Sequence, residues 1–269
     1  MTAAVPQSSH IFAQFLEQLA DAAGAAIMPH FRQGSAIDNK LEKGFDPVTI
    51  ADKNGELAMR DLINRTYPSH GILGEEHGPE NLEAEHVWVL DPIDGTRAFI
   101  TGLPTWGSLI GLCSSKKPSL GMMLQPYIGE RFTGDCSGAW YSGPLGTQKL
   151  TCRPCTGIEN ATVFTTTPAL FNQVERPVFD QIEQIAQLTR YGTDCYAYCM
   201  VAAGQGDAVI ESGLQAYDIV ALVPIIEGAG GVVTTWTGGS PADGGQIVAS
   251  GDPRLHDLLL KELSAAASA

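Results

Sequence analysis

Basic residues are scarce in this 269-residue chain, where 16 Lys and Arg stand against 30 Asp and Glu and leave a formal net charge of −14. A surface of this sign repels phosphate backbones and anionic membranes, which argues against nucleic acid and membrane partners. No apolar stretch approaches the roughly 18 residues of a membrane span. Residues 1–10 lack the basic and apolar parts of a secretory signal. We therefore expect a cytoplasmic protein.

Cysteine is also sparse, and six in a chain of this length are too few for a disulfide scaffold. Cys152 and Cys155 have the CxxC spacing, and Cys195 and Cys199 stand one helical turn apart, so the four together could supply zinc ligands. However, the first pair follows no strand-to-helix redox pattern, and the second spacing is loose for a zinc knuckle. We favour reduced structural thiols, with a metal or redox role as the alternative.

Apolar residues are plentiful, at 44% of the chain, and their periodicity changes near residue 150. Before it, helical spacing predicts helices at 8–31 and 50–66, followed by short strands separated by Gly and Pro turns. After it, strands alternate with predicted helices at 171–188, 196–203, 217–227 and 253–263. This pattern predicts two tightly joined subdomains, residues 1–150 and residues 151–269.

The densest chemical pattern is DPIDGT at residues 91–96, directly after an apolar strand. Pro92 fixes the turn between two carboxylates, and we expect Asp94 to cap the helix that follows. Gly95 and Thr96 then offer backbone N–H groups to an anion at the N-terminus of that helix. Two neighbouring carboxylates repel each other unless a cation lies between them, and oxygen ligands favour Mg²⁺. The alternative is a plain turn whose aspartates only cap and solvate.

Three other segments carry acidic residues at strand or helix ends: Gly74-Glu75-Glu76, the stretch from Asp46 to Thr49, and Tyr217-Asp218. A buried aspartate at the head of an apolar helix needs a compensating charge. In order and spacing, the four segments resemble the inositol monophosphatase superfamily of Mg²⁺-dependent phosphomonoesterases. The resemblance covers about residues 10 to 263.

The resemblance implies a layered αβαβα sandwich of the inositol monophosphatase and fructose-1,6-bisphosphatase type, with mixed and antiparallel sheets. It further implies a homodimer, two or three Mg²⁺ ions, and hydrolysis of a small phosphate ester by a metal-activated water. The roles it implies are metal ligation by Glu75, Asp91, the Ile93 carbonyl, Asp94 and Asp218; phosphate binding by Gly95 and Thr96; placement of the attacking water by Glu75 and Thr96; and support of these groups by Asp46 and Thr49.

Three residues bear on the substrate. The stretch from Arg97 to Pro104 is similar to the histidinol-phosphate phosphatase branch, and Arg97 is a candidate partner for the phosphate. Asp194 and Glu211 occupy substrate-side positions of the family pattern, and two carboxylates suit a cationic alcohol such as histidinol. Two alternatives are an exposed helical arginine at 97 and a helix-capping aspartate at 194.

These residues predict hydrolysis of histidinol phosphate, a step of histidine biosynthesis. One alternative is an inositol-1-monophosphatase or a broad sugar-phosphate phosphatase. Another is a binding relative that has lost turnover, although every expected ligand is present in the sequence.

Overall fold

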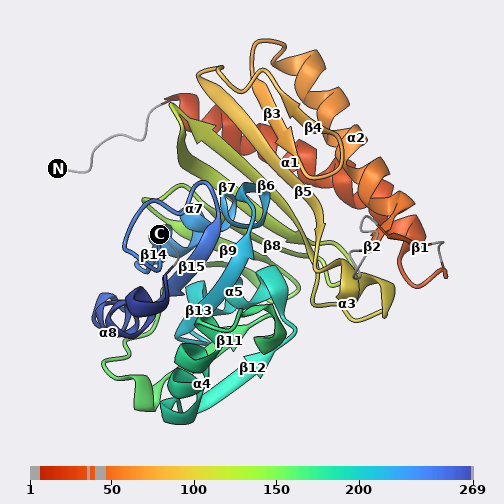
Figure 1. The fold of residues 1–269 in the computed structure, drawn as a ribbon. Helices are drawn as coiled ribbons and strands as arrows, with labels where there is room; N and C mark the ends of the chain where they lie inside the picture. The colour runs from red at the N-terminus through yellow and green to blue at the C-terminus, as the bar shows by residue number, and fades with distance from the viewer. Residues whose placement is uncertain (1–6, 35–36, 40–46, 268–269) are drawn as a thin grey trace.

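The computed structural model describes residues 7–34, 37–39 and 47–267. Its strands form two large sheets with helices against their faces (Figure 1), and a short antiparallel pair, β1 (Ile37–Asn39) and β2 (Pro47–Thr49), lies beside them. One large sheet is built before residue 150 and the other after residue 161. The division into subdomains at residue 150 stays a prediction.

The larger sheet has eight strands in the order β10-β9-β8-β7-β6-β5-β3-β4. All neighbouring strands are antiparallel except β3 and β5, which run parallel. Its strands are β3 (Gly71–Gly74), β4 (Gly78–Glu80), β5 (His86–Asp94), β6 (Gly107–Ser114), β7 (Lys117–Gln125), β8 (Glu130–Gly134), β9 (Ala139–Gly143) and β10 (Gly146–Lys149).

Helices α1 (Gln7–Ile27) and α2 (Ile50–Thr66) pack together on one face of this sheet (Figure 1). Apolar residues of α1 at helical spacing, such as Leu19 and Ile27, are fully buried there. We predicted that this first helix continues to residue 31, but α1 ends at Ile27. Pro29 has no N–H to donate to the preceding turn, so a 3-10 turn replaces the end of the helix.

The smaller sheet has the order β12-β11-β13-β15-β14, with β12, β11 and β13 parallel and the other pairs antiparallel. Its strands are β11 (Thr162–Thr165), β12 (Leu188–Tyr191), β13 (Ala208–Leu214), β14 (Val232–Thr235) and β15 (Gly245–Ser250). Strand β12 was not predicted. It occupies part of the segment after α4 (Glu175–Ile185), which is shorter than the helix predicted at 171–188.

Helices α5 (Asp194–Ala202) and α7 (Leu222–Gly228) lie between the two sheets, and α4 and α8 (Pro253–Leu263) cover the outer face of the smaller one. The layer order is therefore αβαβα, which confirms the predicted fold class (Figure 1). The helix predicted at 217–227 is divided into α6 (Ala216–Ile219) and α7, because Pro224 cannot donate to the carbonyl four residues earlier.

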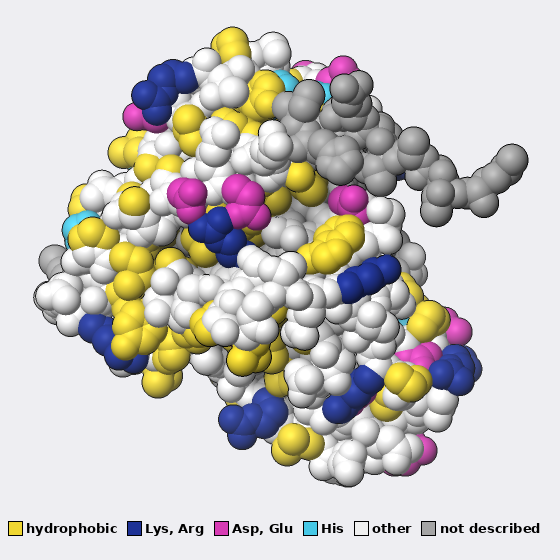
Figure 2. Space-filling view, turned by 180° about the vertical axis from the view of Figure 1, so that it is seen from behind, with side chains coloured by type: hydrophobic (Ala, Val, Ile, Leu, Met, Phe, Trp, Pro, Cys, Tyr) yellow, Lys and Arg dark blue, Asp and Glu magenta, His cyan; other side chains and the backbone are white. Residues whose placement is uncertain are grey.

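Charged side chains on the face in Figure 2 are dispersed, with Lys and Arg scattered among uncharged groups. Within the described ranges, no helix is both long enough and apolar enough to span a membrane.

Candidate active site

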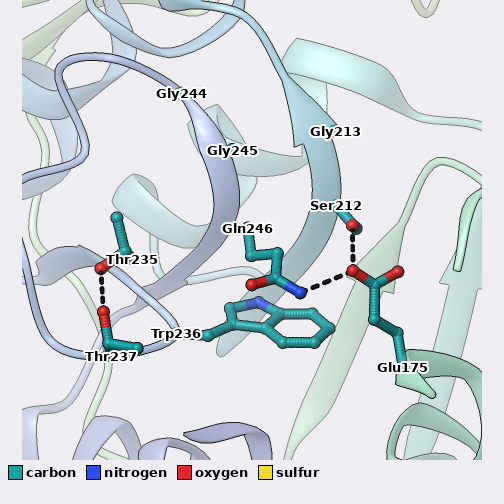
Figure 3. A pocket seen from close by; sticks show the side chains of 9 residues that line it. All are labelled: Glu175, Ser212, Gly213, Thr235, Trp236, Thr237, Gly244, Gly245 and Gln246. Atoms are coloured by element: carbon teal, nitrogen blue, oxygen red, sulfur yellow. Dashed lines mark hydrogen bonds between the residues drawn. The ribbon is translucent and has the colours of Figure 1, made fainter. Parts of the chain in front are cut away.

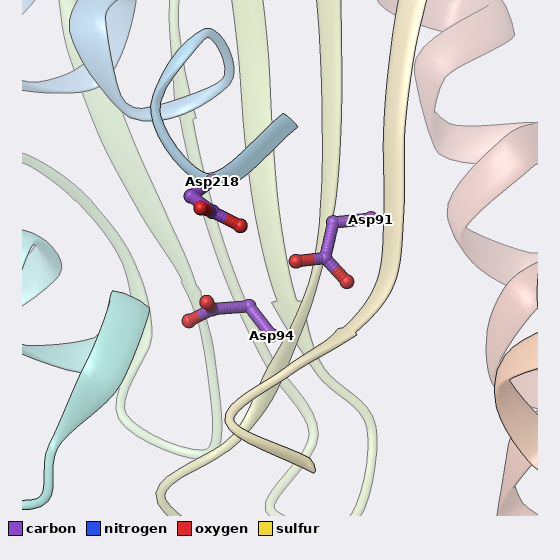
Figure 4. Close-up of side chains that lie close together, drawn as sticks. All are labelled: Asp91, Asp94 and Asp218. Carbon is purple, nitrogen blue, oxygen red and sulfur yellow. The ribbon is translucent and has the colours of Figure 1, made fainter. Parts of the chain in front are cut away.

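Three carboxylates from distant parts of the chain meet near the end of β5 (Figure 4). Asp91 and Asp94 belong to β5, and Asp218 belongs to α6; one carboxylate oxygen from each lies within 4.8 Å of the others. In a regular strand, residues three apart point to opposite faces. Here the pairing of β5 with β6 shifts register between Asp91 and Asp94, at Pro92, and this irregularity brings both side chains to one site.

Backbone amides hold one oxygen of each carboxylate in place. The bonds run from Ile93 N to Asp91 Oδ1 at 3.0 Å, from Cys195 N to Asp94 Oδ2 at 2.6 Å and from Gln215 N to Asp218 Oδ2 at 2.6 Å. Each donor comes from a different part of the chain, namely β5, the start of α5 and the residue before α6. The triad geometry is thus set by the backbone of three elements.

The electrostatics of the triad favour a cation. Burial raises the pKa of Asp91 well above its ordinary value, and the charges of Glu75, Asp94 and Asp218 raise it further. Burial likewise raises the pKa of Asp94, with the charges of Asp194 and Asp218 adding to the effect. A divalent cation among these oxygens would relieve the mutual repulsion.

Glu75 joins this cluster from the end of β3. Its backbone N–H donates to Leu90 O at 3.2 Å, which ties it to β5 one residue before Asp91. The carboxyl group also forms a hydrogen bond with the Asp91 side chain. The structure therefore brings together the four acidic side chains that the sequence assigned to metal ligation.

The start of α2 lies close to Glu75. Thr49 caps this helix by accepting from Ala51 N at 3.1 Å, and its own hydroxyl donates to Asp52 Oδ2 at 2.7 Å. Asp52 is buried, which raises its pKa, and the charge of Glu75 adds to this rise. Its Oδ1 atom has no hydrogen-bond partner among the described residues. Asp46, assigned with Thr49 to a supporting role, lies outside the described residues.

The turn after Asp94 differs from the prediction that this aspartate caps the next helix. Gly95 is the cap residue of α3 (Thr96–Ile100), and no side chain bonds to the helix start. Gly95 has a left-handed φ of 87°, which only glycine adopts readily, and the Asp94 carboxylate instead accepts from the start of α5. The Thr96 hydroxyl donates to Ile93 O at 3.1 Å.

The donor set fits a hard divalent cation. It consists of clustered carboxylates, and the pKa values of Asp91 and Asp94 are raised. Asp52, near enough for the charge of Glu75 to raise its pKa, adds a buried oxygen without a partner among the described residues. Such oxygen ligands are those that Mg²⁺ prefers. The alternative that the cysteines bind zinc gains no support. Among the described residues, the His, Cys, Asp and Glu side chains that gather closely enough to hold a metal ion are those of the acidic triad. None of the six cysteines forms a disulfide, and burial raises the pKa of each thiol.

The substrate-side residues lie next to the turn at Gly95. A Cβ atom added to Gly95 would stand 3.3 Å from Asp194, so this aspartate contacts the turn directly. Burial raises the pKa of Asp194 to about 6, opposed by a hydrogen bond from Thr166 and by the charge of exposed Arg97. The alternative that Asp194 caps α5 was wrong, because Thr193 is the cap residue and Asp194 is the first residue inside the helix.

Glu211 is 3% exposed and shares Thr166 with Asp194. Thr166 N donates to Glu211 Oε1 at 2.6 Å, and the Thr165 hydroxyl donates to Oε2 at 3.3 Å. Burial raises the pKa of Glu211 to about 8 despite these bonds. Thr166 therefore links the two carboxylates that the sequence assigned to substrate binding.

Comparison with known proteins agrees with this geometry. The model of the inositol monophosphatase family matches residues 9–268. The chain belongs to this family. Membership confirms the predicted superfamily, whose members are Mg²⁺-dependent phosphatases.

Individual relatives carry more specific names. The chain is 42% identical to "Bifunctional phosphatase IMPL2, chloroplastic" of Arabidopsis thaliana, over 94% of this chain and 75% of the plant protein. It is 30% identical to a histidinol-phosphatase of Chlorobaculum parvum, over 91% and 94%. An inositol monophosphatase structure from Zymomonas mobilis is 36% identical, with a TM-score of 0.84, over 97% of this chain and 100% of the other.

Sequence reasoning missed two residues of this family member's site. Thr166 ends the strand predicted at 162–166 and carries no charge, so only the fold shows that it bridges Asp194 and Glu211. Tyr198 lies in the apolar helix α5, and the sequence pattern assigned it no role. It is 3% exposed, its hydroxyl has no hydrogen-bond partner among the described residues, and nearby charges on Glu211 and Asp94 help burial to raise its pKa.

A separate cavity of about 400 Å³ lies at the edge of the smaller sheet (Figure 3). Its buried Glu175 accepts from the Ser212 hydroxyl at 2.8 Å and from Gln246 Nε2 at 2.6 Å. The cavity shares no lining residue with the acidic triad. Its polar side chains join α4 to β13 and β15 by bonding to one another.

Proposed function

We propose that this chain hydrolyses histidinol phosphate to histidinol and inorganic phosphate. The phosphatase chemistry is supported by the family and by the acidic cluster. In this proposal the residues that hold two or three Mg²⁺ ions are Glu75, Asp91, the carbonyl of Ile93, Asp94 and Asp218, with Asp46 and Thr49 in support.

The reaction replaces one P–O bond with another. A water oxygen bonds to phosphorus, the ester P–O bond breaks, and the leaving alcohol oxygen takes a proton. Mg²⁺, when bound, would lower the pKa of that water and neutralise charge on the phosphoryl and leaving oxygens. Glu75 and Thr96 hold the water, while the N–H groups of Gly95 and Thr96 hold the phosphate.

The choice of substrate rests on one observation, the pair of carboxylates linked by Thr166 beside the phosphate-binding turn. Histidinol carries an ammonium and a titratable imidazole, and each cation would offset the cost of a buried carboxylate at Asp194 or Glu211. Inositol offers only hydroxyl groups. Arg97, exposed at the rim, is placed to pair with the ester phosphate in this proposal.

The histidinol-phosphatase name of the Chlorobaculum relative supports this choice. The second candidate is an inositol-1-monophosphatase or a broad sugar-phosphate phosphatase. The structural similarity to the Zymomonas inositol monophosphatase favours it. We also retain the predicted homodimer as a proposal.

The test compares kcat/KM for histidinol phosphate and inositol 1-phosphate, with Mg²⁺ and with EDTA. We expect preference for histidinol phosphate. Asp194→Asn should lower kcat/KM for this ester roughly 5- to 150-fold, which corresponds to a loss of about 1–3 kcal/mol of transition-state stabilisation. The control is Asp180→Asn, which changes a carboxylate in α4 outside the site and should leave both substrates unaffected. Preference for inositol 1-phosphate would overturn the proposed substrate assignment. Absence of phosphate release from either ester would overturn the proposed phosphatase chemistry.

A further inference from the structure

A second buried carboxylate, Glu56 in α2, lies behind the loop that carries Glu75. Its side chain is 0% exposed and reaches from the helix to backbone amides of the loop. Oε2 accepts from Glu76 N at 2.7 Å, and Oε1 accepts from His77 N at 3.1 Å. One side chain of α2 thus binds the two amides that directly follow Glu75.

Arg60, one turn further along α2, completes this contact. Its Nε donates to Glu56 Oε1 at 2.7 Å, and its Nη2 donates to the carbonyl of Gly78, the first residue of β4. A third bond, from Nη1 to Glu80 at 3.4 Å, reaches the last residue of the same strand. Glu56 and Arg60, which we call the α2 brace, therefore form hydrogen bonds with both amide and carbonyl groups of residues 76–78.

The brace leaves Glu75 little freedom to move. On one side, Glu75 N is bonded to Leu90 O of β5, and on the other the next two amides are bonded to Glu56. The preceding residue is Gly74, where an added Cβ atom would stand 2.0 Å from Glu56 Oε1. The glycine at this position is what allows the helix carboxylate to approach the loop.

We propose that Glu56 and Arg60 are positioning residues for the metal site, which hold the backbone around Glu75 so that its carboxylate faces Asp91. This inference rests on the proposed function, because it takes Glu75 to be a metal ligand. A buried ion pair often contributes little net stability. In contrast, substitution of residues that hydrogen-bond to metal ligands and orient them typically lowers metal affinity or activity by about 10- to 100-fold.

The experiment uses Glu56→Gln in the full-length protein. Glutamine keeps the size and one acceptor oxygen but places an NH₂ group where Oε2 accepts from the Glu76 amide. Arg60→Gln is the second variant, since it leaves Glu56 in place and releases Gly78. Binding of Mn²⁺ without substrate is measured by calorimetry and electron paramagnetic resonance, together with Tm and the Mg²⁺ dependence of kcat.

Asp207→Asn provides a matched control. Asp207 is 1% exposed, accepts from Thr162 N at 2.7 Å and pairs with Arg153, so it is also a buried carboxylate joining an arginine to backbone. It lies at the start of β13, outside the metal site. We expect this variant to lower Tm while binding Mn²⁺ as the unaltered protein does.

The brace predicts that Glu56→Gln weakens Mn²⁺ binding by about 10- to 100-fold, while kcat at saturating Mg²⁺ changes by less than about 3-fold. Arg60→Gln should shift metal affinity in the same direction by a smaller factor. If folded Glu56→Gln and Arg60→Gln bind Mn²⁺ as tightly as the unaltered protein, the brace is overturned and the proposed function stands. If the unaltered protein binds no metal, both are overturned.

Discussion

The acidic triad predicts opposite effects of one substitution on stability, depending on whether metal is present. Asp91→Asn removes one charge from a group whose ligand oxygens lie within 4.8 Å of one another. Burial and then the charges of Glu75, Asp94 and Asp218 raise the pKa of Asp91, so without metal the substitution relieves this repulsion. With metal, it removes a proposed ligand. We therefore expect the variant to be more stable than the unaltered protein in EDTA and less stable in excess Mg²⁺.

The size of the effect follows from the geometry. At about 4.8 Å and an effective dielectric constant near 20, a pair of full charges repels by about 3 kcal/mol. This figure is for two full charges, and we expect a smaller net gain of about 1–2 kcal/mol, or roughly 2–8 °C in Tm. Magnesium at about 100 times its Kd adds about 2.7 kcal/mol to the unaltered protein, enough to reverse the order.

The assay is calorimetric unfolding of both proteins at pH 7.5 in EDTA and in Mg²⁺, with Asp180→Asn as the surface control. Acidification supplies a second check. Because folding raises the pKa of Asp91 and Asp94, the metal-free protein should lose stability as pH rises above their ordinary value. The reasoning is refuted if Asp91→Asn lowers Tm in EDTA, or if Mg²⁺ raises the Tm of both proteins equally.

Three further predictions concern other parts of the molecule. Gly121→Ala places a Cβ atom 1.9 Å from Ala221 O and should cost at least about 1–3 kcal/mol in urea unfolding; an unchanged midpoint would contradict the close packing. Asp252→Ala removes the α8 cap and should cost about 0.5–2 kcal/mol at pH 7. Its neighbouring arginine lowers the pKa of Asp252, so this difference should shrink as pH falls below about 3.8; a constant difference would refute it. Burial raises the pKa of Glu211 to about 8, so this carboxyl group should gain its charge, and KM for histidinol phosphate should fall, as pH rises towards 8. Glu211→Gln should abolish this pH dependence of KM, and a dependence that persists in the variant would show that another group causes it.

Features determined by short stretches of sequence were predicted well. The run DPIDGT contains the strand end, the proline turn and two carboxylates within six residues, so local chemistry was enough to mark the site. The family pattern then placed Glu75 and Asp218 in the same cluster, and the fold brings them there. The layered fold followed from the same resemblance.

Features that depend on distant contacts were missed. The capping role predicted for Asp94 was wrong because Gly95, with a left-handed φ, is the cap residue of α3, and the Asp94 carboxylate accepts from Cys195 N in α5. Strand β12 is short and mostly exposed, so it has little apolar periodicity of its own. The Thr166 amide donates to Glu211 of another segment, and Glu56 accepts from the Glu76 amide in the loop after β3. No local sequence pattern indicates such bonds.

The most direct test of the central claim is anomalous diffraction from crystals soaked in Mn²⁺. The account predicts anomalous peaks from Mn²⁺ ions that are coordinated by Asp91, Asp94 and Asp218, with Glu75 as a further ligand of these ions. Crystals of Asp91→Asn soaked at the same Mn²⁺ concentration should show no such peaks. Manganese bound elsewhere, or a triad that stays empty while the enzyme turns over histidinol phosphate, would contradict it.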